Sequence, residues 1–264
     1  MSDPIFSRSR RRLVRSIALA APADSQWLLD RMTEELVDRL DFISIDARSA
    51  LVIGHGAKAL RAKFPHETQI LSCDLAAGPG VDIIAEEDRL PIADGSQDLI
   101  MACGTLDNID DLPGALILMR RALKPGGLFL GALLGAGSLS QLRACTLKAE
   151  TELTGQMALR FHPQIDVRSA GDLLFRAGFS TPVADQENIS VTYSNLGRLR
   201  ADVKAAGASN ALSMIQPMPR VVAKALRASM LGAPFQEEFA PIYMTGWAPV
   251  AGEQRPSGPS KGLF

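Results

Sequence analysis

Apolar and polar residues along this chain follow two patterns, one typical of helices and one typical of buried strands. In residues 26–43 (QWLLDRMTEELVDRLDFI), apolar side chains recur at helical spacing, at Leu28, Met32, Leu36 and Leu40. Charged residues lie between them, so this segment predicts an amphipathic helix.

Five short apolar runs follow this helix and predict strands. They cover residues 49–55, 68–75, 81–87, 96–104 and 128–135. The first, second and fourth are continuous in apolarity, as strands covered on both faces tend to be. Helical segments at residues 57–65 and 111–123 separate some of these runs. The alternation predicts an α/β fold with a doubly wound, Rossmann-like parallel sheet and helices on both faces.

Right-handed crossovers place the carboxyl ends of such strands along one edge of the sheet. In this chain those ends are Gly54, Asp74, Glu86 and Gly104. Because doubly wound folds bind ligands at this edge, we expect the functional site there.

The pattern changes after residue 137, and the chain divides into four parts. We expect helices at residues 138–153 and 169–179 and strands at 187–193 and 241–249. The expected parts are N-terminal basic and amphipathic helices at 1–45, a core at 46–194, and a helical insertion with the last strand of the same domain at 195–250. Residues 251–264, rich in Gly, Pro and Ser, predict a disordered tail.

Composition limits the class of protein and its partners. The chain has 264 residues, 47% of them apolar and 22% charged, with a formal net charge of -1. This balance gives no reason to expect a nucleic-acid partner, and no apolar run reaches the roughly 18 residues of a transmembrane span. Three cysteines without C-x-x-C spacing indicate a reducing compartment.

The basic segment at residues 7–21 (SRSRRRLVRSIALAA) leaves two interpretations open. It has features of a transit peptide or short signal sequence. The alternative is a basic first helix with Arg10, Arg11, Arg12 and Arg15 on a solvated or partner-facing side.

The turn Gly54-His55-Gly56 fits the relaxed dinucleotide pattern G-x-G-x-x-G/A, with Ala59 in the last position. Glycines let backbone amides approach a ligand, and Asp74, 20 residues after Gly54, is placed to bind ribose hydroxyls. A nicotinamide dinucleotide and S-adenosylmethionine meet these requirements about equally well.

The downstream segment distinguishes the two cofactors by its resemblance to class I S-adenosylmethionine-dependent methyltransferases. The matching motifs are Glu86-Glu87-x-x-Leu90-Pro91-Ile92, Asp98-Leu99-Ile100 and Leu123-Lys124-Pro125-Gly126-Gly127. The resemblance implies S-adenosylmethionine as cofactor, with Glu86 and Glu87 near the adenine.

A closer resemblance covers nearly the whole chain and points to the complex I assembly factor five family and the related malonyl-carrier-protein methyltransferases. It rests on segments such as Arg176-Ala177-Gly178-Phe179 and Thr245-Gly246-Trp247. The mitochondrial member is a hydroxylase of an arginine in a complex I subunit, so the resemblance implies complex I assembly as a role. Residues 5–40 resemble the mature beginning of the family, which implies a bacterial cytoplasmic protein.

These inferences together define an expected cofactor site and leave the catalytic residue unassigned. The expected contacts come from Gly54, His55, Gly56, Asp74, Leu75, Glu86, Glu87 and Gly104. Val52 stands where the family has an acid and Lys58 replaces the third glycine, so we expect weakened cofactor binding. We expect no metal site at His55, Cys73 and Cys103, and we expect Asp107, Asp110 and Asp111 to form a helix-capping turn.

Three functions remain open. The favoured one is a methyltransferase, or a hydroxylase on that fold, acting on an arginine of a complex I subunit, another protein or a carrier-bound substrate. The second is a non-catalytic complex I assembly chaperone on a degenerate methyltransferase fold. The third, an NAD(P)-dependent oxidoreductase, rests only on the relaxed glycine pattern.

Overall fold

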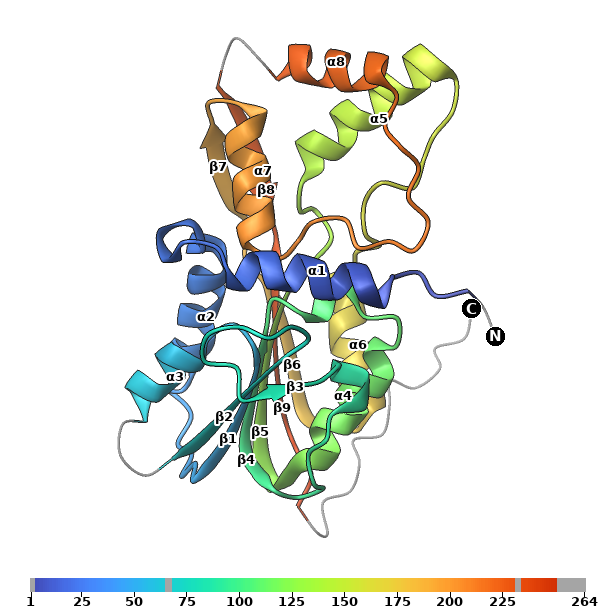
Figure 1. The fold of residues 1–264 in the computed structure, drawn as a ribbon. Helices are drawn as coiled ribbons and strands as arrows, with labels where there is room; N and C mark the ends of the chain where they lie inside the picture. The colour runs from blue at the N-terminus through green and yellow to red at the C-terminus, as the bar shows by residue number, and fades with distance from the viewer. Residues whose placement is uncertain (1–2, 65–67, 231–233, 251–264) are drawn as a thin grey trace.

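A computed structural model describes residues 3–64, 68–230 and 234–250. Within these residues, a seven-stranded sheet has the strand order β3-β2-β1-β4-β5-β9-β6 (Figure 1). Its strands are β1 (Ser49–Gly54), β2 (Gln69–Asp74), β3 (Ile83–Ile84), β4 (Gln97–Cys103), β5 (Leu123–Leu134), β6 (Ser180–Gln186) and β9 (Pro241–Trp247). Strands β1 to β5 are parallel, and β9 runs antiparallel to both β5 and β6.

Helices cover both faces of this sheet, as the alternating pattern predicts. These are α2 (Trp27–Arg39) and α3 (Ala57–Lys63) on one face and α4 (Leu112–Ala122) and α6 (Val167–Ala177) on the other. The remaining helices of the described residues are α1 (Arg8–Leu19), α5 (Ser140–Thr154), α7 (Leu196–Ala205) and α8 (Arg220–Ser229). In β1, Val52 packs with Leu28 of α2 on one face, and Leu51 packs in a second core with Leu116 of α4. All four side chains are buried, which explains the continuous apolarity of the strand.

Four strands differ from the sequence-based expectation. β5 begins at Leu123 rather than at residue 128, and β8 (Phe235–Phe239) lies in the segment expected as a helical insertion. The run at 81–87 forms only β3, because the Asp82 carboxylate accepts the Ser72 amide at 2.8 Å and the chain then enters a 3-10 turn at Glu87–Arg89. β6 was missed because it is an edge strand that contains Pro182 and several polar residues.

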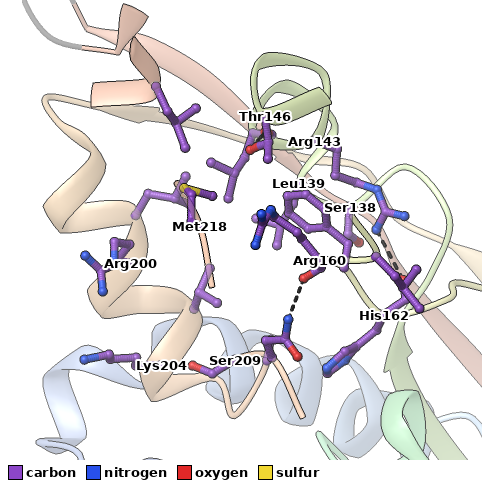
Figure 2. Close-up of a pocket in the computed structure, with 18 of the residues that line it drawn as sticks. Ser138, Leu139, Arg143, Thr146, Arg160, His162, Arg200, Lys204, Ser209 and Met218 are labelled. Carbon is purple, nitrogen blue, oxygen red and sulfur yellow. Dashed lines mark hydrogen bonds between the residues drawn. The ribbon is translucent and has the colours of Figure 1, made fainter. Parts of the chain in front are cut away.

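A cap rises from the sheet and contains α5, α7, α8 and a separate pair of strands, β7 (Ile189–Tyr193) and β8 (Phe235–Phe239) (Figure 1). The predicted helix at 138–153 and strand at 187–193 are the α5 and β7 of this cap. Its elements enclose a cavity of about 560 Å³ (Figure 2). Helix α1 crosses between the sheet and the cap (Figure 1).

The described residues include no helix with both the length and the apolar character needed to span a bilayer. The expected disorder of 251–264 lies outside the described residues.

The amino ends of the strands are joined by a polar cluster around Asp98. Its carboxylate accepts the Ser49 amide at 2.9 Å and the Lys124 ammonium at 2.9 Å. Burial raises the pKa of Asp98, but the hydrogen bonds from Lys124 and Ser49 outweigh it and lower the pKa overall. Asp98 and Lys124 belong to two of the methyltransferase-like motifs, and here they lie at the edge opposite Asp74.

Asp98→Asn should therefore destabilise the fold without reaching the opposite edge. Hydrogen bonds to charged groups contribute about 1.5–3 kcal/mol, so we expect the free energy of unfolding to fall by about 1–3 kcal/mol in urea titrations. Asp94→Asn is the control, since Asp94 and its partner Arg121 are both exposed and such pairs contribute about 0–1 kcal/mol. Equal effects of the two substitutions would contradict this role.

Candidate functional site

The glycine turn joins β1 to α3 at the carboxyl edge of the sheet. Gly54 and Gly56 have φ of 84° and 115°, in the region that favours glycine. A Cβ on Gly54 would lie 2.2 Å from the Cys103 carbonyl oxygen, so no larger residue fits there. The His55 amide donates to the same carbonyl at 3.0 Å, and its ring contacts Asp30 at 2.8 Å.

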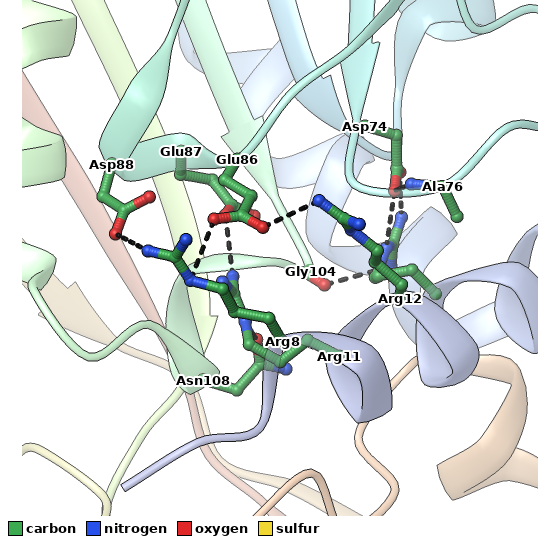
Figure 3. Close-up of polar contacts among 11 residues, drawn as sticks. Arg8, Arg11, Arg12, Asp74, Ala76, Glu86, Glu87, Asp88, Gly104 and Asn108 are labelled. Carbon is green, nitrogen blue, oxygen red and sulfur yellow. Dashed lines mark hydrogen bonds and ion pairs between the residues drawn. The ribbon is translucent and has the colours of Figure 1, made fainter. Parts of the chain in front are cut away.

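Asp74 is the last residue of β2, and its carboxylate is 1% exposed. Oδ1 accepts hydrogen bonds from the Ala76 amide at 3.3 Å and from Arg15 Nε at 3.2 Å. Oδ2 accepts from Arg15 Nη2 at 2.6 Å (Figure 3). The acid predicted to bind ribose therefore holds a guanidinium of α1 in a bidentate pair.

The two predicted adenine acids lie beyond β3 and are also paired with α1. Glu87 Oε2 accepts from Arg11 Nη2 at 2.7 Å, and Glu86 Oε1 accepts from Arg12 Nη2 at 3.0 Å (Figure 3). Burial raises the pKa of Glu87 while the Arg11 cation lowers it, and burial is the larger effect. The remaining expected contacts, Leu75 and Gly104, are buried at the same edge.

The expectation that the arginines of the first helix lie on a solvated or partner-facing side is wrong for Arg11 and Arg15. Arg11 and Arg15 are 3% and 1% exposed, because the carboxylates at the strand ends attract them. Burial lowers the pKa of Arg15, but Asp74 outweighs it and the pKa is raised overall. The spacing of the arginines in the sequence already indicated a shared face, since Arg8, Arg11, Arg12 and Arg15 lie on one side of a helix.

The two departures from the family pattern lie in different surroundings. Val52 is fully buried in the core beside α2, and Lys58 is exposed on the first turn of α3. Neither contacts Asp74 or Glu87 through any described interaction. Weakened cofactor binding stays a prediction.

The three aspartates after β4 have separate roles. Asp111 caps α4 by accepting the Gly114 amide at 2.8 Å, and Asp110 accepts the Phe6 amide at 3.0 Å. Asp107 instead lines the cap cavity, where burial raises its pKa. Asp107 thus joins the sheet edge to the cavity. Within the described residues, no group of three or more His, Cys, Asp or Glu side chains could hold a metal ion.

Sequence reasoning did not predict the cap cavity, because segments far apart in the chain build it. Its apolar walls include Leu139, Leu142, Leu199 and Leu226. Five cationic residues also line it: Arg143, Arg160, Arg200, Lys204 and Arg227. Arg160 pairs with the buried Glu150, and burial lowers the pKa of Arg143.

The residues at the strand ends fit an adenosyl cofactor in chemistry, although α1 occupies them in this conformation. A buried carboxylate lies at the end of β2, beside a glycine turn that leads into a helix, as such a ligand requires. Two buried polar atoms nearby, Glu87 Oε1 and Asn108 Nδ2, have no hydrogen-bond partner among the described residues.

Comparisons with known proteins identify the family to which this site belongs. A family model described as "Methyltransferase domain" matches residues 54–131, from the glycine turn through most of β5. A malonyl-[acyl-carrier protein] O-methyltransferase of Methylovorus sp. is 33% identical over 236 residues, which cover 80% of this chain and 77% of that protein. The chain belongs to the S-adenosylmethionine-dependent methyltransferase family.

A second group of relatives in this family carries another name. The mitochondrial arginine-hydroxylase NDUFAF5 of Mus musculus is 33% identical over 220 residues, which cover 78% of this chain. The match spans only 64% of that protein's length.

Solved structures support the same methyltransferase fold. A 1,6-didemethyltoxoflavin-N1-methyltransferase of Burkholderia thailandensis matches with a TM-score of 0.52 at 14% identity, covering 94% of this chain and 93% of that one. The predicted family and the doubly wound fold are therefore confirmed.

His162 provides a pH-dependent test of how the cap meets α1. Its Nε2 accepts the Ala211 amide at 2.9 Å, and its ring lies edge-on to Phe6. Burial, with the nearby cations of Arg143 and Arg11, lowers the pKa of His162 to about 4.

The unfolded chain, with an ordinary histidine pKa of about 6.5, therefore binds more protons than the folded chain between about pH 6.5 and 4. The free energy of unfolding should fall as the pH drops through this window. We expect His162→Gln to show a shallower fall in urea unfolding measured at several pH values. Parallel pH profiles for the two proteins would contradict a neutral, partly buried His162.

Proposed function

We propose that this chain transfers a methyl group from S-adenosylmethionine to a carboxylate-bearing substrate held in the cap cavity. The proposal rests on one observation: the carboxyl edge of the sheet adjoins the cap cavity. Carboxylates and a glycine turn suited to an adenosyl group lie at the sheet edge, and Asp107, three residues beyond Gly104, lines the cavity. When bound, the cofactor supplies an electrophilic methyl group.

In this proposal the chain's own residues hold and orient the two ligands. Asp74 accepts hydrogen bonds from the ribose hydroxyls, and Glu86 and Glu87 face the adenine. Leu75, His55 and Gly104 complete the walls beside Gly54 and Gly56. Alignment of the acceptor with the methyl carbon is the main contribution that an enzyme makes to such a transfer.

The charge of the cavity favours an anionic substrate over an arginine. Five cationic residues line it, and Asp107 is the one acid among the described lining residues. Burial raises the pKa of Asp107, so this acid opposes an anionic ligand less than an exposed aspartate would. A guanidinium entering the cavity would be repelled, whereas a carboxylate would be attracted. This supports a carrier-bound acyl substrate, in line with the name of the Methylovorus relative.

A second candidate is a non-catalytic role as a complex I assembly chaperone, with a complex I subunit as protein partner. The names of the NDUFAF5 relatives and the occupation of Asp74 by Arg15 favour it. A bacterial cytoplasmic location is also part of the proposal. Cys73, Cys103 and Cys145 are all free, as expected in a reducing compartment.

Titration calorimetry with S-adenosylhomocysteine tests the cofactor site. We expect Asp74→Asn to weaken binding by about 10- to 100-fold, because hydrogen bonds to a charged group contribute about 1.5–3 kcal/mol. Asp94→Asn, at the opposite edge, should leave the Kd unchanged. A folded wild-type protein that binds neither S-adenosylmethionine nor its product at millimolar concentration would overturn the proposal.

Transfer of labelled methyl groups to two acceptors tests the substrate class. We expect a malonyl thioester to be methylated and an arginine-containing peptide to be inert. Arg143→Gln should raise KM for the thioester by about 5- to 10-fold through loss of a partly buried cation. Lys148→Gln is the control, since Lys148 is exposed on the same helix and does not line the cavity. Methylation of the peptide alone would reject the anionic substrate.

A further inference from the structure

Helix α1 presents a row of arginines to the carboxyl edge of the sheet. The ion pairs are Arg8 with Glu86 and Asp88, Arg11 with Glu87, Arg12 with Glu86, and Arg15 with Asp74 (Figure 3). Two of these pairs are buried. Neither side chain of Arg15–Asp74 exceeds 1% exposure, and neither side chain of Arg11–Glu87 exceeds 4%.

Arg15 covers the position where an adenosyl ribose would meet the sheet. Its guanidinium bonds Asp74 at the end of β2 and donates from Nη1 to the Gly104 carbonyl, just beyond β4, at 3.1 Å. Strand β1 lies between β2 and β4 in the sheet. The Arg15 side chain therefore spans the end of β1, where the turn at Gly54 begins.

We propose that α1 is a self-inhibitory plug, and that its docked arginines and the adenosyl cofactor compete for the same carboxylates. The proposal rests on the proposed function, because it assumes that Asp74 and Glu87 bind the cofactor. It adds that α1 leaves this edge before the cofactor enters. The N-terminal helix thereby sets the apparent affinity of the site.

One observation and one physical argument support the exchange of α1 for a ligand. Glu87 Oε1 and Asn108 Nδ2 are buried without a hydrogen-bond partner among the described residues, although Arg11 bonds the other polar atom of each side chain. The docked helix thus satisfies only part of the polar surface that it covers. Buried ion pairs also stabilise weakly in net terms, because desolvation offsets much of the Coulomb attraction. Ribose hydroxyls can replace the guanidinium as donors to Asp74.

The plug is held at its amino end by the cap. Phe6 is buried in a small cluster with Val14, Ala211 and Leu212, and its ring lies 5.0 Å from that of His162, which lines the cavity. Backbone hydrogen bonds join Ser7 to Ala211 and Ser213 to Ile5. Weakening the Phe6 cluster should therefore release α1 without touching Asp74 or Glu87.

A reversible cross-link can hold the plug in place. A Cβ on Gly78, in the loop after Asp74, would lie 3.1 Å from Leu19 Cβ at the end of α1. This is close to the 3.5–4.5 Å typical of disulfides. In a Cys145→Ser background, oxidised Leu19→Cys/Gly78→Cys should bind S-adenosylhomocysteine at least tenfold more weakly than the same protein after reduction.

A second variant moves the equilibrium in the other direction. Phe6→Ala should bind S-adenosylhomocysteine about tenfold more tightly than wild type, because a larger fraction of molecules has α1 released. Ile5→Ala is the matched control, since Ile5 is 48% exposed beside Phe6. Hydrogen exchange of the α1 amides, measured without ligand, should be faster in Phe6→Ala and slower in the oxidised cross-linked protein.

The outcomes separate this inference from the proposed function. Equal affinity in the oxidised, reduced and Phe6→Ala proteins would overturn the plug and leave the methyltransferase proposal standing. If no variant binds the cofactor product although hydrogen exchange shows α1 released, both are overturned. Weak binding in the oxidised protein together with tighter binding in Phe6→Ala supports the plug.

Discussion

The attraction between four carboxylates and four arginines sets the arrangement of this protein. The parallel strands bring Asp74, Glu86, Glu87 and Asp88 to one edge, where like charges repel and burial is costly. Helix α1 supplies the compensating cations from within the chain. The same pairing places α1 between the sheet and the cap, so the charges that suit the edge to a cofactor also place a helix over it.

The polar residues at the two edges of the sheet have different roles. Asp98 and Lys124 belong to methyltransferase-like motifs, yet they bond each other and Ser49 at the amino ends of the strands. Their contribution is to hold β1, β4 and the start of β5 in register. The acids at the carboxyl ends instead bond arginines of α1, and the proposed function assigns them to a cofactor site. A motif match therefore identifies the family here without separating structural residues from those that meet a ligand.

The cap cavity and the carboxyl edge of the sheet are built largely by different segments of the chain. The cavity draws on α5, α7, α8 and the segment around His162, and it meets the sheet edge at Asp107. Changes in the cap can alter the charge and shape of the cavity while Asp74 and the glycine turn stay in place.

The sequence by itself determined the fold class, the positions of β1, β2, β4 and the later part of β5, and the expected site residues at the strand ends. These follow from local apolar runs and from the rule that parallel strands end at one edge, and neither depends on distant contacts. The edge strand β6 escaped prediction because Pro182 and polar neighbours mask its pattern. Only the tertiary structure decided that Arg11 and Arg15 are buried on Glu87 and Asp74, and that the cap encloses a cationic cavity. Helical spacing shows that arginines share a face, but what this face meets depends on chain segments 59 to 76 residues away.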